Sequence, residues 1–102
     1  MKESRIEQMA CKQILEKFNV ISVKLTPAQS TGYPDRLFWL PGGKPLLIEF
    51  KRPNEQLSPK QSHINLGLKM LGYQVEVCRS AAQAVAVVEL ALLSQKRAHL
   101  RS

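Results

Sequence analysis

Two carboxylates and one amine lie close together in the middle of the sequence. Asp35 follows a Gly-Tyr-Pro segment, and an apolar run that starts at Leu46 carries Glu49 and ends at Lys51. Side chains two residues apart in a strand share a face, so Glu49 and Lys51 point the same way, with Phe50 opposite. Such a set, held in an apolar frame, is what a metal-dependent phosphodiesterase needs.

The metal expected here is a hard divalent cation with oxygen ligands, Mg²⁺ or Mn²⁺. Asp35 and Glu49 supply carboxylates, and the main-chain carbonyl of Phe50 is a further candidate ligand. The ion would polarise a scissile phosphate and lower the pKa of a bound water, which Lys51 could orient. Taken alone, an Asp followed by Glu-x-Lys is also compatible with a chance surface salt bridge.

The neighbouring residues predict a hairpin that positions this set. Residues 35–40 and 45–51 read as strands, and the Pro-Gly-Gly-Lys turn between them makes the pair antiparallel. Pro34 cannot donate to a strand ladder, which places it at the start of the first strand. Leu37 and Trp39 share the face of Asp35, so the carboxylates lie at the ends of otherwise apolar faces. An apolar floor strengthens metal and phosphate contacts.

Residues 4–18 predict an amphipathic helix, with Ser4 as its cap and Glu7 as the capping-box partner. The expected apolar stripe is Ile6, Ala10, Ile14 and Phe18, widened by Met9 and Leu15. Glu7 either serves this cap or leans over the site. Residues 20–25 alternate and predict a strand, and residues 26–32 form a polar loop for substrate contact or plain connection.

A second helix is predicted to begin after Ser58, with Pro59 at its first position, and to stop at Gly72. Its expected buried stripe is Ile64, Leu68 and Leu71. Gln61 is either the capping-box residue or an inward-facing group at a helix N-terminus, which suits a phosphate.

The last part of the chain predicts one more strand and one more helix. Residues 73–78 alternate strictly and should run parallel to an earlier strand, because a helix crosses between them. Ser80 and Gln83 cap a helix whose buried face is Ala84, Val85, Val88 and Leu92. Residues 94–102 read as a basic tail that frays. The order is αβββαβα, an α/β fold in one domain, residues 1–102.

Composition limits the partners and the compartment. Fifteen Lys and Arg against eight Asp and Glu give a net charge of +7, which predicts attraction to polyanions such as nucleic acid. Cys11 and Cys78 fit no metal-ligand spacing and read as free buried thiols in a reducing cytosol. The sequence shows no hydrophobic signal core and no apolar run long enough for a membrane span, so we expect a cytoplasmic protein.

Several runs together resemble a known nuclease family. They are GYPDRL at 32–37, LPGG at 40–43, IEFK at 48–51, LSPKQ at 57–61 and LGYQV at 71–75. In this spacing they resemble the VRR-NUC domain, a branch of the PD-(D/E)xK nuclease superfamily close to Holliday junction resolvases. The resemblance implies a restriction-endonuclease-like αβββαβ core, here with an extra C-terminal helix.

The resemblance also implies roles for individual residues. Asp35 and Glu49 match the metal-binding carboxylates, Lys51 the catalytic lysine, Gln61 the glutamine that contacts the site, and Glu7 the first-helix acid. The candidate DNA contacts are Lys24, for a phosphate, with Arg36, Lys44, Lys60 and Lys69 from position.

Short standalone members of this kind look phage-like and resemble resolvases that work as homodimers on four-way junctions. A phage-encoded protein would act in the cytoplasm of its bacterial host. The apolar excess of VAVVELALL at 85–93 is a candidate dimer surface, the alternative being a fully covered helix. The alternatives to a junction resolvase are a flap or linear DNA nuclease and a non-catalytic DNA-binding domain.

Overall fold

The computed structural model describes residues 1–25 and 32–101, with side chains up to Gln95. Its elements, in chain order, are α1 (Glu3–Lys17), β1 (Ile21–Lys24), β2 (Arg36–Trp39), β3 (Pro45–Phe50), α2 (Pro59–Met70), β4 (Gln74–Cys78) and α3 (Ala81–Arg101). This is the predicted order. Most of the polar loop predicted at 26–32 lies outside the described residues.

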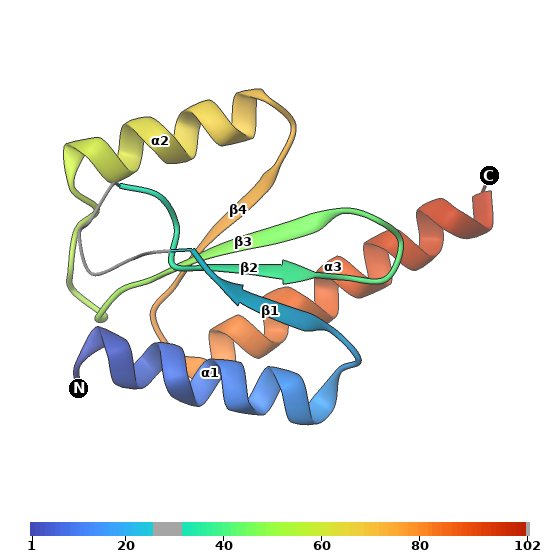
Figure 1. Cartoon of the computed structure of the whole chain (residues 1–102), viewed down its shortest axis with the longest axis horizontal. Helices are drawn as coiled ribbons and strands as arrows, with labels where there is room; N and C mark the ends of the chain where they lie inside the picture. The colour runs from blue at the N-terminus through green and yellow to red at the C-terminus, as the bar shows by residue number, and fades with distance from the viewer. Residues whose placement is uncertain (26–31, 102) are drawn as a thin grey trace.

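The four strands form one mixed sheet in the order β1-β2-β3-β4. The β1–β2 and β2–β3 pairs are antiparallel, whereas β3 and β4 run parallel, as the α2 crossover requires. Helices α1 and α3 pack side by side on one face of the sheet, and α2 lies on the other (Figure 1). The predicted α/β fold is confirmed.

The main core lies between the sheet and the α1–α3 pair. It comprises Ile6, Ala10, Cys11, Ile14, Phe38, Leu40, Leu46, Ile48, Phe50, Cys78, Ala84, Val88 and Ala91. Strand β3 alternates across the sheet, so Ile48 and Phe50 enter this core while Glu49 turns to the α2 face. Both cysteines are buried free thiols, as predicted.

The helix ends test the cap predictions. Ser58 and Gln61 form the predicted capping box, with Pro59 at the first position of α2. The prediction for α1 was wrong, because this helix begins at Glu3 and its N-cap, Lys2, makes no side-chain cap bond. Glu7 is not free to cap, since its carboxylate is held by Arg36.

Three burial predictions were also wrong. Met9 and Leu15 are exposed, because the α1 face packed on the core is narrower than its apolar stripe. On α2, Leu71 is 76% exposed while Asn65 is buried, because α2 covers only part of the sheet. The prediction for the end of the chain differs in another way. Residues 94–102 were expected to fray, whereas α3 is helical through Arg101.

Candidate active site

Asp35 and Glu49 face each other where β2 begins and β3 ends. The register pairs Arg36 with Ile48, so Asp35 and Glu49 form the next pair outward and share a face of the sheet. The Asp35 N–H donates to the Ile48 carbonyl, and the Phe50 N–H donates to Asp35 Oδ2 at 2.8 Å. The extended hairpin therefore fixes both carboxylates, as predicted from the sequence.

Gln61 connects this pair to the start of α2. Its Nε2 donates to Glu49 Oε2 at 3.3 Å, and its Oε1 accepts from the Ser58 N–H at 2.9 Å. A main-chain N–H can only donate, so it turns the amide oxygen toward itself and the NH₂ toward Glu49. One side chain thus completes the predicted capping box and also contacts Glu49, and the role of Gln61 in the reaction stays a prediction.

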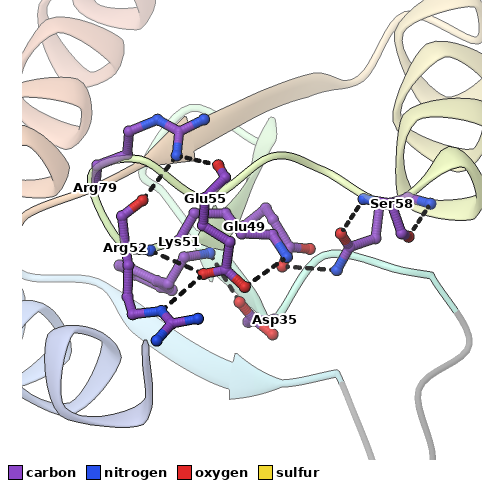
Figure 2. Close-up of polar contacts among 9 residues, drawn as sticks. Asp35, Glu49, Lys51, Arg52, Glu55, Ser58 and Arg79 are labelled. Carbon is purple, nitrogen blue, oxygen red and sulfur yellow. Dashed lines mark hydrogen bonds and ion pairs between the residues drawn. The ribbon is translucent and has the colours of Figure 1, made fainter. Parts of the chain in front are cut away.

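Lys51 is buried on the same face, and its Nζ lies 3.7 Å from Glu55 Oε2. Figure 2 shows the side chains of Asp35, Glu49 and Lys51 together, with Glu55 beside them. Glu55 was not predicted as a site residue. The only signal in the sequence is an acid four residues after Lys51, within a Pro-Asn turn.

A second acid, Glu3, reaches this region from the first turn of α1. Burial and a side-chain hydrogen bond with Glu55 raise the pKa of Glu3 to about 7. The same bond, with the Arg52 N–H, lowers the pKa of Glu55 to about 2. Near neutral pH Glu3 is therefore partly protonated, while Glu55 stays ionised beside Lys51.

The Asp35–Glu49 pair also retains a proton near neutral pH. Burial, followed by the charge of Asp35, raises the pKa of Glu49 to about 8. Burial also raises the pKa of Asp35, although the Phe50 N–H opposes that shift. A divalent cation would favour the fully ionised pair, because it replaces the shared proton with positive charge.

The donor set fits a hard cation. Glu49 Oε1 is buried and has no hydrogen-bond partner among the described residues. In a strand the N–H and C=O of one residue point to the same side. Because the Phe50 N–H points to Asp35, the Phe50 carbonyl points to the side of the strand on which Asp35 lies. The described residues contain no group of three His, Cys, Asp or Glu arranged for a metal. Carboxylate and carbonyl oxygens are the ligands that a hard divalent cation prefers.

Glu7 lies beside these groups on the α1 side of the sheet, and, in addition to burial, its negative charge contributes to the raised pKa of Asp35. Its Oε2 is 2.7 Å from Arg36 Nε and 3.5 Å from Lys24 Nζ, and Glu7 is buried. Arg36 follows Asp35 in the strand, so its side chain takes the opposite face. Glu7 thus braces β1 and β2 beneath Asp35, and its catalytic role stays a prediction.

The remaining basic candidates fall in two places. Lys60 lies in the first turn of α2 and packs against Gly32, where an added Cβ would lie 2.8 Å from Lys60 Cγ. Gly32 also has φ +84°, a conformation that favours glycine. Both the close contact with Lys60 and the backbone conformation therefore require glycine at position 32. Lys44 and Lys69 line a hollow of about 540 Å³ at the other end of β3.

The raised pKa of Glu49 predicts that Glu49→Gln stabilises the metal-free protein at alkaline pH. The folded pKa of about 8 exceeds the ordinary 4.5, so the native state binds the proton more tightly between these values. The free energy of unfolding should therefore fall as pH rises through this window, a loss that glutamine avoids. Urea unfolding in EDTA at pH 9 should favour Glu49→Gln by on the order of 2 kcal/mol.

At pH 4 the advantage of Glu49→Gln should largely disappear, because both folded and unfolded wild type are then substantially protonated. Glu16→Gln, an exposed acid on α1, is the matched control. Equal stability of Glu49→Gln and wild type at pH 9 would contradict the raised pKa.

The fold and this site together define a restriction-endonuclease-like nuclease, with Pro34-Asp35 directly before β2 and Glu49-Phe50-Lys51 at the end of the adjacent strand β3. The VRR-NUC domain family matches residues 2–82. The chain therefore belongs to the VRR-NUC family of the PD-(D/E)xK nuclease superfamily, as the sequence motifs predicted.

Two relatives agree with this assignment. A protein of Acyrthosiphon pisum secondary endosymbiont phage 1, named "Putative nuclease p44", is 35% identical over 80 residues, which cover 78% of this chain and 85% of the phage protein. A solved structure named "VRR_NUC domain" superposes with a TM-score of 0.72 at 27% identity, covering 85% of this chain and 94% of the other. Within the described residues, no helix is long and apolar enough to cross a membrane.

Proposed function

We propose that this protein is a Mg²⁺- or Mn²⁺-dependent endonuclease that cleaves branched DNA, with a four-way junction as its substrate. The observation that carries the proposal is the Asp35–Glu49 pair, fixed across β2 and β3 with an orphaned buried oxygen on Glu49. Family membership supports a nuclease, and the phage relative supports action in the cytoplasm of a bacterial host.

Each residue of the site has a distinct task in this proposal. Asp35, Glu49 and the Phe50 carbonyl would hold the ion, which when bound polarises the scissile phosphate and lowers the pKa of a coordinated water. Gln61 keeps Glu49 oriented through Nε2. Lys51 places its ammonium on the same face, where it stabilises negative charge that develops on the phosphate.

The charge distribution supports a DNA substrate. The net charge is +7, although five of the eight acids are Asp35, Glu49, Glu3, Glu7 and Glu55, in or beside the site. Lys24 and Lys60 have exposed side chains near it, and Lys44 and Lys69 lie farther along β3. We propose that these lysines, with Arg36, follow the phosphate backbone. Their contacts give affinity, while the shape of the substrate gives selectivity.

The selectivity is tested by digesting a four-way junction, a flap and a plain duplex of matched sequence in parallel with Mn²⁺. We expect the junction to be cut fastest. Equal rates on all three would remove the resolvase assignment and leave a general nuclease. Faster cutting of the flap would favour the flap nuclease instead.

We further propose that the protein acts as a homodimer, because a two-fold dimer presents paired sites to the paired scissile phosphates of a junction. The predicted surface lies on α3, where Leu90 is 64% exposed and Leu93 is 50% exposed. A second apolar area lies on β1 and β2, where Ile21 is 66% exposed.

The dimer surface can be tested by adding a charge to each area. We expect Leu90→Glu to give a monomer mass in light scattering and to lose junction cutting, because it places a carboxylate in an apolar interface. Ile21→Glu is the matched control and should stay dimeric. The reverse pattern would move the interface to the sheet, and a monomeric wild type at micromolar concentration would contradict the dimer.

A further inference from the structure

The turn that follows β3 holds an acid against the Lys51 ammonium. Residues 52–55 form this turn, and the Glu55 N–H donates to the Arg52 carbonyl at 3.1 Å. Glu55 Oε1 accepts from the Arg52 N–H at 3.1 Å, which leaves Oε2 facing Lys51 Nζ at 3.7 Å. The position of the Glu55 carboxylate therefore depends on the shape of the turn.

Arg79 holds this turn from outside. Its Nη1 donates to the Arg52 carbonyl at 2.8 Å and also to the Glu55 carbonyl, as Figure 2 shows. One nitrogen thus joins the first and last residues of the turn. Both bonds go to main-chain atoms, so they fix the backbone that carries the Glu55 side chain.

The backbone of Arg79 is itself anchored beside Lys51. Its N–H donates to Gln83 Oε1 at 2.7 Å in the first turn of α3. The preceding residue, Cys78, accepts from the Lys51 N–H at 3.0 Å. The β4–α3 junction therefore holds the main chain of Lys51 and, through the Arg79 side chain, the turn that faces the Lys51 ammonium.

We propose that Arg79 is a positioning residue for phosphodiester cleavage, acting through Glu55 on the Lys51 ammonium. A lysine side chain has a flexible four-carbon stem, so without a fixed partner its ammonium samples several positions. We call Arg79, the 52–55 turn and Glu55 the clamp. The clamp holds the Lys51 ammonium in one position, on the face shared with Asp35 and Glu49. This role rests on the proposed function, in which Lys51 acts on the scissile phosphate.

The test compares single-turnover cleavage of a junction by saturating wild type, Arg79→Met, Arg79→Lys, Glu55→Gln and the Arg79→Met/Glu55→Gln double variant. Arg79→Met should slow cleavage by about tenfold, because a misplaced catalytic group is inefficient, with junction affinity in EDTA unchanged. Arg79→Lys should restore most of the rate, because a single nitrogen makes both bonds. The double variant should be no slower than Glu55→Gln alone, since both changes act on the same contact, the one between Glu55 and Lys51.

Arg5→Met, an exposed arginine on α1, controls for the loss of one positive charge. Rate losses that multiply in the double variant would overturn the proposal, as would equal rates for Arg79→Lys and Arg79→Met or a wild-type rate for Glu55→Gln. If circular dichroism shows Arg79→Met unfolded, the Arg79→Lys and Glu55→Gln rates still decide: a wild-type rate for Glu55→Gln overturns the proposal.

A readout without substrate separates this proposal from the proposed function. The NMR signal of the Lys51 ε-methylene should shift in Arg79→Met and in Glu55→Gln, and stay in place in Arg79→Lys and Arg5→Met. An unmoved signal in Arg79→Met would overturn the clamp even if wild type cleaves. Conversely, a wild type that cuts no DNA would contradict the proposed function, while the NMR signal of Lys51 would still show whether Arg79 positions its ammonium.

Discussion

Asp35→Asn is expected to abolish cleavage of a four-way junction while leaving junction binding intact. The amide keeps an oxygen that can accept from the Phe50 N–H, so the hairpin should retain its geometry. It loses the negative charge that the proposed metal site needs. The loss of several kcal/mol of transition-state stabilisation corresponds to about 10³-fold in rate.

The measurement pairs a cleavage assay in Mn²⁺ with a binding assay in EDTA. Affinity should be unchanged and should fall steeply with added salt in both proteins, because it depends on the basic surface. Glu16→Gln removes one exposed negative charge and serves as the control. Wild-type cleavage by Asp35→Asn would exclude Asp35 from the metal site.

Lys51→Met is expected to slow cleavage by about 10²- to 10³-fold, because it removes the buried ammonium that faces the developing charge. Methionine keeps much of the apolar stem, so packing beneath the Asp35–Glu49 pair should be retained. Junction affinity should change little, since Lys51 is only 6% exposed and contributes little to the basic surface.

The same comparison addresses the non-catalytic alternative. Lys12→Met, an exposed lysine on α1, should cleave at the wild-type rate and controls for charge. If wild type and Lys51→Met both bind the junction and both fail to cut it, the protein is a DNA-binding domain rather than an enzyme.

Much of the site could be predicted because its residues are positioned by sequence patterns that extend over only a few residues. The turn at 41–44 sets the hairpin, alternation in β3 separates Glu49 from Phe50, and the Ser58–Gln61 box starts α2. Each of these signals acts over a few residues. The pairing of Asp35 with Glu49 then follows from the hairpin register.

The contacts that were missed span long distances in the chain. Arg79 holds residues 24 and 27 positions earlier, and Glu3, on α1, contacts Glu55, which follows β3. Glu7 was expected either to cap α1 or to lean over the site, and the sequence did not predict that its carboxylate pairs with Arg36, 29 residues away. No periodicity or cap motif encodes such pairs, because they depend on how helices and strand ends pack together.

The dependence of the reaction on a metal at the Asp35–Glu49 pair is tested most directly by a crystal soaked in Mn²⁺, with data collected at the Mn absorption edge. We expect one anomalous peak between the two carboxylates, near the Phe50 carbonyl, and its loss in Asp35→Asn. A peak elsewhere, with none between the two carboxylates, would contradict the proposed metal site.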